Sequence, residues 1–184
     1  RYMFTATVRR DGSSRFKEHW ATFPAFALGW KINEESFLKN TSWLDELKLR
    51  LGYGKTGQQD GIGNYNYFQS YNDNTKTTNG RYPMVGVGGG DGVMYRPDAY
   101  NEELKWETTS TYNVGLDFSV LRDRVRGSVD YYYRKTTDLL NDAYVPTGSN
   151  FRNKVKSNIG SLENKGLEAS LTVRPIQTTD WQVE

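Results

Sequence analysis

The sequence predicts an all-β fold in which antiparallel strands run up and down as a segment of a transmembrane β-barrel. A hairpin between Tyr112 and Tyr133 alternates apolar with polar or small residues in both of its strands. Each of these strands has about ten alternating residues, which matches a tilted membrane strand of about 9 to 11 and exceeds a typical globular strand of about 5 to 6. The chain also has 13 Tyr, 5 Trp and 18 Gly among 184 residues, a composition that favours strands and turns over helices.

Alternation alone fits two kinds of protein. The apolar face of a strand packs against a second sheet in a soluble β-sandwich, whereas it faces lipid in a membrane barrel. Hydrophobic residues make up only 36% of the chain and the mean hydropathy is -0.78, low values for a protein that must fill its own interior. We therefore favour the barrel, and a soluble carbohydrate-binding β-sandwich stays open as the alternative.

Three strands are expected before a long irregular stretch. The first occupies residues 2–9 and ends at the turn formers of residues 11–14. The second occupies residues 20–32, with Pro24 near its start, where no ladder hydrogen bond is needed. The third occupies residues 47–53. The alternation then stops over residues 57–103, and so long a loop inside an ordered domain is usually functional.

Four more strands are expected after the long loop. The central hairpin contributes residues 112–120 and 125–133, and an irregular stretch follows over residues 141–158. A sixth strand covers residues 167–173, and a seventh begins at Trp181. The chain thus predicts about seven strands of a larger barrel, of the class with about 22 strands and a plugged lumen.

The predicted connections divide between the two ends of the barrel. Their lengths are roughly 9, 13, 49, 5, 19 and 5 residues, and strands that run up and down place alternate connections at the same end. One end then carries the connections of 9, 49 and 19 residues, and the other those of 13, 5 and 5. When each connection is compared with the next one along the chain, two of the three pairs fit long outer loops and short inner turns, and the first pair, 9 and 13, does not. The five tryptophans, Trp20, Trp30, Trp43, Trp106 and Trp181, fall at or just beyond strand ends, where the aromatic girdles of membrane barrels lie.

Composition argues against several other functions. No apolar run reaches 18 residues, and the first residues lack the anatomy of a signal peptide, so we expect a piece of a longer chain without a transmembrane helix. The chain has no cysteine, which excludes disulfides and thiolate metal sites. A net charge of +2 without a block of like charges predicts no nucleic-acid partner.

We expect no enzyme and no cofactor. The carboxylate pairs Glu34-Glu35 and Glu102-Glu103 are adjacent in sequence, so on an extended chain they point apart. The glycines of residues 86–92 lack phosphate-loop spacing. His19 is the only histidine, which leaves little support for a barrel that is itself a hydrolase and none for a histidine metal site, so no metal is predicted. A calcium ion held near Asn72-Asp73-Asn74 or Asp91 stays open.

Aromatic residues of the long loop are the substrate-binding candidates. Such rings can stack on sugar faces or pack within a folded loop. The candidates are Tyr65, Tyr67, Phe68, Tyr71 and Tyr82. The inward-facing charged residues are expected to form a solvated network on the lumen wall and not a specific site, and they are Lys48, Arg50, Arg126, Asp130 and Arg134. On this basis Leu116→Arg should be costly and Asp117→Arg mild.

Motifs along nearly the whole chain resemble the barrel of SusC/RagA-type TonB-dependent outer-membrane transporters. They occur in the family's order, and although each is weak alone, the set is specific. The motifs are Arg9-Arg10-Asp11-Gly12-Ser13-Ser14-Arg15-Phe16, Gly29-Trp30-Lys31-Ile32, Trp43-Leu44-Asp45, Tyr53-Gly54-Lys55-Thr56-Gly57, Leu104-Lys105-Trp106-Glu107, Thr137-Asp138-Leu139-Leu140 and Asn158-Ile159-Gly160.

The resemblance implies a function that the strand pattern does not. It implies active import of oligosaccharides, or of peptides or other large nutrients, across the outer membrane of a Gram-negative bacterium. The implied partners are a SusD-like surface lipoprotein, the TonB complex, a glycan or peptide substrate and the lipid bilayer. Residues 1–184 are then a partial barrel domain, and the family's plug domain and TonB box are absent from this chain.

Overall fold

The computed structural model describes residues 1–73, 84–85, 91–92, 95–146, 153–177 and 182–183. Its long strands are β1 (Tyr2–Gly12), β2 (Trp20–Lys31), β3 (Leu44–Gln58), β8 (Glu107–Val120), β9 (Val125–Thr137) and β12 (Ser161–Val173). The shorter elements are the 3-10 helix η1 (Ile32–Glu34) and the strands β4 (Tyr71–Asp73), β5 (Met84–Val85), β6 (Asp91–Gly92), β7 (Tyr95–Pro97), β10 (Leu140–Tyr144), β11 (Lys154–Asn158), β13 (Ile176–Gln177) and β14 (Gln182–Val183). Within these residues no helix is long and apolar enough to cross a membrane.

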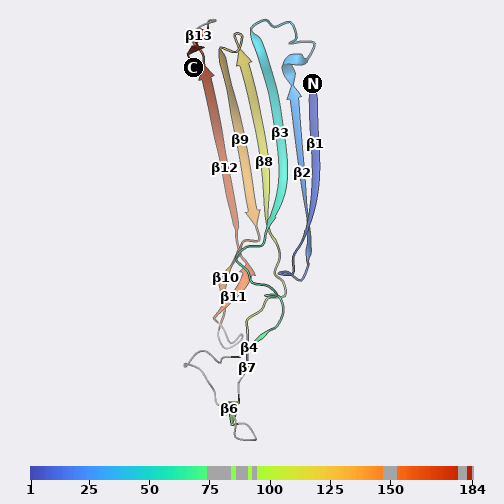
Figure 1. Cartoon of the computed structure of the whole chain (residues 1–184), viewed down its shortest axis with the longest axis vertical. Coiled ribbons are helices and arrows are strands. Elements are labelled where there is room, and N and C mark those ends of the chain that lie inside the picture. Colours follow the sequence, from blue (N-terminus) through green and yellow to red (C-terminus); the bar gives the residue numbers. More distant parts are fainter. Residues whose placement is uncertain (74–83, 86–90, 93–94, 147–152, 178–181, 184) are drawn as a thin grey trace.

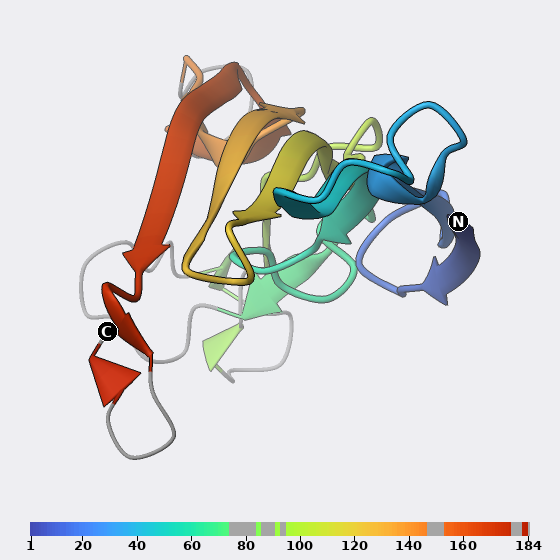
Figure 2. The same ribbon diagram turned by 90° about the horizontal axis from the view of Figure 1, so that it is seen from above.

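The six long strands form one sheet in the order β1-β2-β3-β8-β9-β12. Every neighbouring pair is antiparallel, so the chain runs up and down without a crossover (Figure 1). Seen along the strands, the sheet is an open wall with β1 and β12 at its edges (Figure 2). The predicted antiparallel up-and-down arrangement is confirmed.

The connections separate into two ends, which we call the loop end and the turn end. The loop end, at the bottom of Figure 1, carries residues 13–19 and the described parts of the connections 59–106 and 138–160. The turn end carries residues 32–43 and the four-residue turn 121–124. This is the predicted division, with the longest connection and the shortest at opposite ends of the sheet.

Two predicted elements differ from the structure. The stretch 141–158 was expected to be irregular, but β10 and β11 pair within it, from Leu140 with Asn158 to Tyr144 with Lys154. The expected seventh strand is represented by β14, which pairs with β13 and not with the large sheet, so six of the predicted seven strands form the wall in the described residues. Trp181 lies outside the described residues.

One face of the wall is apolar. Directly paired residues of antiparallel strands lie on the same face, and rows of such pairs run through all six strands, of which one serves as an example. The row is Ala6, Phe26, Tyr53, Tyr112, Tyr133 and Lys165. Its four rings form a ladder, with successive centroids 6.3, 5.0 and 6.2 Å apart. We call this the outward face.

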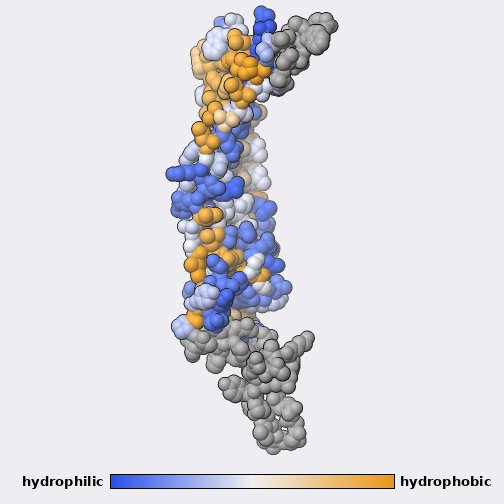
Figure 3. Space-filling view, turned by 90° about the vertical axis from the view of Figure 1, so that its left-hand side faces the viewer, coloured by the Kyte–Doolittle hydropathy of each residue, from blue (hydrophilic) through white to orange (hydrophobic). Residues whose placement is uncertain are grey.

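The outward face has no covering layer in the described part of the chain. Phe4, Leu167 and Leu171 are exposed there, where a soluble sandwich would bury them. Viewed toward one edge of the wall, hydrophobic atoms gather toward the turn end, a hydrophilic zone follows near the middle, and a smaller hydrophobic patch lies nearer the loop end (Figure 3). An uncovered apolar sheet of this length fits a lipid environment.

The inward face is polar, and its charges form a defined cluster near the middle of the wall. Arg50 donates two hydrogen bonds of 2.8 Å to the carboxylate of Asp117 and further hydrogen bonds of 2.9 and 3.0 Å to Asp130. Arg50 and Asp130 are both paired with Gly115 in the register. A Cβ at Gly115 would lie only 2.8 Å from the Arg50 guanidinium, so the glycine lets the side chain cross β8.

This cluster corrects the expectation that Asp117→Arg is mild. The substitution would replace a carboxylate that holds Arg50 by a second cation beside it. A position on the same strand without such a partner, Asn113, is the better inward reference because it is exposed on the inward face.

Candidate functional site at the loop end

The buried hydrophobic core of the described residues lies at the loop end and not between layers. Phe16 is fully buried, and its ring centroid lies 4.9 Å from that of Trp106, which in turn lies 5.8 Å from Phe23. Ile62 and Leu104 complete the cluster. The five residues come from the connection 13–19, from β2 and from both stems of the long loop. Trp106 therefore stands at a strand end as predicted, but it is buried in this cluster and does not face lipid.

The connection 13–19 clamps both stems of the long loop. Arg15 donates a hydrogen bond of 2.8 Å from Nη1 to the carbonyl oxygen of Gln59, on the first stem. Lys17 forms an ion pair of 3.1 Å with Glu102, on the second stem. Arg15 and Lys17 thus fix where the long loop leaves the wall and where it returns.

A second clamp joins the long loop to the β10–β11 hairpin. The side-chain amide of Asn158 accepts a 2.8 Å hydrogen bond from the backbone N–H of Lys105 and donates one of 2.8 Å to the Lys105 carbonyl. It also donates to the carbonyl of Asp138. Asn101 donates from its amide to the carbonyl of Lys156, at 3.1 Å. The hairpin and the long loop therefore form one structural unit.

Four of the five substrate-binding candidates lie on one segment of this unit. Tyr65, Phe68 and Tyr71 are exposed, whereas Tyr67 is half-buried with its ring 6.2 Å from that of His19. Backbone hydrogen bonds tie the segment to residues 98–101, and β4 pairs with β7 beyond it. The fifth candidate, Tyr82, lies outside the described residues.

Tyr65 has an uncommon backbone conformation. Its φ is +59°, in the left-handed region that bulky side chains rarely adopt. The next turn is closed by a 2.9 Å hydrogen bond from the N–H of Phe68 to the Tyr65 carbonyl. Conformations of this kind persist where the surrounding structure enforces them, and they are concentrated at functional sites.

An outer groove separates residues 65–71, which we call the aromatic segment, from the β10–β11 hairpin. One wall carries Phe68, with a side chain 65% exposed, and the other carries Asp142 and Lys156. The Lys156 ammonium, 2.8 Å from the Asp142 carboxylate, lowers the pKa of that carboxyl by hydrogen bonding. An apolar ring that faces paired charges suits a ligand with both an apolar face and polar edges. The remaining lining residues are Asn66, Ser70, Asp98, Ala99, Lys154 and Val155.

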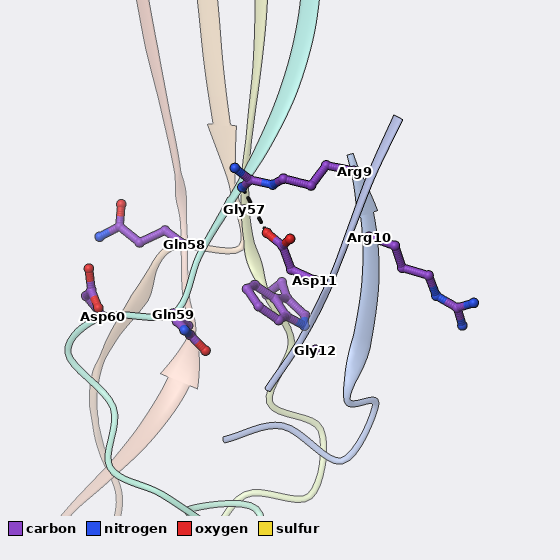
Figure 4. A pocket seen from close by; sticks show the side chains of 9 residues that line it. Arg9, Arg10, Asp11, Gly12, Gly57, Gln58, Gln59 and Asp60 are labelled. Carbon is purple, nitrogen blue, oxygen red and sulfur yellow. Dashed lines mark ion pairs between the residues drawn. The ribbon is translucent and has the colours of Figure 1, made fainter. Parts of the chain in front are cut away.

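An inner pocket lies where β1 and β3 reach the loop end (Figure 4). Arg9 and Asp11 form a 2.8 Å ion pair on one side of it, and Gln58, Gln59 and Asp60 line the other. Trp106 also lines it, and its buried Nε1–H has no hydrogen-bond partner among the described residues. The buried side-chain oxygen of Gln59 likewise has none. Both atoms are buried from solvent, so the polar side chains that the pocket exposes are others, among them Arg9, Gln58 and Asp60.

Sequence reasoning missed the contribution of β10 and β11 to the outer groove. Val155 between Lys154 and Lys156 gives only a short alternation, and the surrounding Pro, Gly and Asn residues predicted a loop. For metal, no group of three or more His, Cys, Asp or Glu side chains lies together in the described residues. The calcium candidates Asn72, Asp73 and Asp91 have no described side chains, and Asn74 lies outside the described residues.

Comparisons with known proteins agree with the architecture. The family model described as TonB dependent receptor-like, beta-barrel matches residues 1–184. The TonB-dependent receptor SusC of Bacteroides thetaiotaomicron is 49% identical over 98% of this chain, and the TonB-dependent receptor P39 of Formosa agariphila is 41% identical over 96%. The chain spans 18% and 16% of these two relatives.

Solved structures give the same result. The RagAB peptide importer in its open-open state superposes with a TM-score of 0.80 and 31% identity, covering 98% of this chain and 19% of that chain. The siderophore receptor PirA of Pseudomonas aeruginosa, at 18% identity and a TM-score of 0.52, shares the fold alone. Members of this family are outer-membrane transporters and not enzymes. The chain belongs to the TonB-dependent receptor-like β-barrel family, and within it to the SusC/RagA-like receptors.

Proposed function

We propose that this chain is part of a TonB-dependent transporter that imports oligosaccharides or other large nutrients across the outer membrane. The wall described above is part of its barrel, with the loop end outside the cell. The plug domain and the TonB box belong to the longer protein outside residues 1–184. A SusD-like lipoprotein covers the loop end, and TonB supplies the energy.

The observation that carries this proposal is the 49% identity to SusC over 98% of the chain. Peptides stay the second substrate class, because the RagAB structures are those of a peptide importer. The outer groove favours sugars, since an exposed ring beside amide and carboxylate groups can contact a sugar ring on its apolar face and hold its hydroxyls at the edges. The partner lipoprotein is supported by the two-component RagAB assembly to which the chain is similar.

The experiment replaces the exposed rings in the full-length transporter. Tyr65→Ala, Phe68→Ala and Tyr71→Ala combined should abolish growth on the cognate oligosaccharide, because the rings that contact it are removed, while the amount of barrel in the outer membrane stays unchanged. The matched control is Phe37→Ala, which removes a ring that is 70% exposed at the turn end. Unchanged uptake by the triple variant would show that these aromatics do not bind the substrate, and growth on a defined peptide source alone would assign the second substrate class.

A further inference from the structure

The outward face changes character abruptly toward the loop end. On four of the six strands, the first outward-facing residue beyond the apolar stretch is basic, and on β2 and β8 it carries a hydroxyl group. The basic residues are Arg10 after Val8, Lys55 after Tyr53, Lys135 after Tyr133 and Lys165 after Leu167, and the hydroxyl residues are Thr22 and Ser110. We call the four basic residues the basic belt. Strands lie about 4.8 Å apart, so the belt extends about 24 Å across the wall.

The belt follows the edge of the apolar surface obliquely. Ala6 and Lys165 lie in the same row of the sheet, yet the apolar stretch of β1 continues past Ala6 to Val8, whereas that of β12 has already ended at Leu167. Strands of a membrane barrel are tilted by about 35 to 45°, so a plane parallel to the membrane crosses the rows at an angle. The basic residues therefore lie near one depth, just outside the hydrocarbon region.

Few acidic groups neutralise the belt. Lys135 forms an ion pair of 2.9 Å with Glu163, and among the described residues Arg10, Lys55 and Lys165 form none. Arg10 instead lies over the Trp20 ring, 5.2 Å from its centroid, with both side chains exposed. Four cations against one carboxylate leave an excess of three positive charges facing the membrane surface.

The turn end offers a contrast. Its basic residues Arg122 and Arg124 lie beside Asp123, and the N–H of Asp123 donates a hydrogen bond to the Asp45 carboxylate. Both signs of charge are thus mixed there. Among the described residues, the loop end thus presents a band of mainly positive charge directly beyond an aromatic and aliphatic surface.

We propose that the basic belt binds the phosphate groups of the phosphorylated glycolipid that forms the outer leaflet of the outer membrane. Arginine and lysine that flank an apolar membrane surface attract anionic lipid head groups, while the acyl chains lie along the apolar residues below. Arg10 can hold a phosphate with two parallel hydrogen bonds, and the lysines act as flexible point charges. This inference requires the loop end to face outward, but it does not depend on which nutrient is imported.

The experiment measures lipid bound to the purified full-length barrel in detergent. Lipid A carrying its phosphates, and the same lipid after removal of the phosphates, are each added, and the bound molecules are counted by native mass spectrometry. The unaltered barrel should bind the phosphorylated lipid at least tenfold more tightly. Arg10→Gln, Lys55→Gln and Lys165→Gln combined should lose most of this preference.

The matched control removes three charges at the other end, with Lys39→Gln, Arg122→Gln and Arg124→Gln, and it should keep the preference. Equal binding of the two lipids by the unaltered barrel would overturn the proposal without any variant, as would a belt variant that keeps the full preference. Transport assays give a separate readout, so a barrel that fails to import the expected sugar can still pass this test.

Discussion

The two faces of the wall are built from the same strands but by different rules. On the outward face, the row Phe26, Tyr53, Tyr112 and Tyr133 needs only apolar rings of sufficient size, since lipid conforms to whatever surface it meets. On the inward face, Arg50 needs carboxylates at two particular positions and a glycine between them. The outward face thus tolerates change within a chemical class, while the inward cluster depends on individual residues.

The largest effect should come from a charge placed on the outward face. Leu116→Arg should destabilise the barrel by about 2–4 kcal/mol if the residue lies near the bilayer midplane, because the cation enters hydrocarbon. The measurement is the unfolding free energy of the full-length barrel in lipid vesicles. The matched variant Asn113→Arg adds the same cation to the inward face of the same strand and should cost far less. Equal costs would mean that the faces are assigned wrongly.

Loss of the central cation should have the next largest effect. Arg50→Gln leaves Asp117 and Asp130 facing each other without a counter-charge, and a cost of about 1–2 kcal/mol is expected because all three side chains are partly exposed. Adding Asp130→Asn should recover part of that loss in the same unfolding measurement. A double variant as unstable as the sum of the two single variants would show that the three residues act independently.

A methyl group at Gly115 should have a smaller effect. Gly115→Ala places a Cβ against Arg50 and Asp130, and their flexible ends must move, at about 1 kcal/mol. Gly54→Ala is the control, because the nearest atom to its new Cβ is 3.8 Å away at Ala25. A double-mutant cycle with Arg50→Gln measures the coupling between the two residues. Fully additive changes in the unfolding free energy would contradict the crossing of Arg50 over Gly115.

The smallest effect should be a pH dependence at the turn end. Glu35 accepts hydrogen bonds from the Tyr2 hydroxyl, at 2.7 Å, and from the Trp30 indole, at 3.0 Å, and these lower the pKa of its carboxyl. A lowered pKa adds stability above the unfolded-state value of about 4.3, and that stability is lost as the pH falls below it. Glu35→Gln should therefore weaken the acid sensitivity of unfolding below about pH 4.3. An unchanged acid profile would contradict the role of this carboxylate.

The sequence predicted the six-stranded wall better than the charge cluster of Arg50, Asp117 and Asp130 on its inward face. Strict alternation in residues 112–120 fixes which side chains share a face, and the turn formers fix where strands end. The register between β3, β8 and β9 is not encoded in any local pattern. The sequence therefore predicted a solvated network of charged residues but not the specific contacts of Arg50 with Asp117 and Asp130. Pairing over 67 and 80 residues requires the folded sheet.

The candidate site was predicted only in part. The interleaving of aromatic residues with Asn and Gly in the long loop indicated Tyr65 and Phe68 as substrate-binding candidates. In the structure both side chains are exposed at the loop end. The clamp by Asn158 was not predicted, because an amide side chain that pairs with the Lys105 backbone has no sequence period. Phe16 was noticed as part of a motif, but its full burial against Trp106 depends on a contact across 90 residues of chain.

The most direct test of the two-faced wall is a nitroxide scan of residues 112–120 in the full-length barrel in lipid vesicles. The described chain segment has no cysteine of its own, so single cysteines can be placed one by one within it. Oxygen, which concentrates in lipid, should relax labels at even positions such as Val114 and Leu116, and a water-soluble nickel complex should relax those at odd positions such as Asn113. Even positions shielded from both reagents would show a buried apolar face and would contradict a wall that meets lipid.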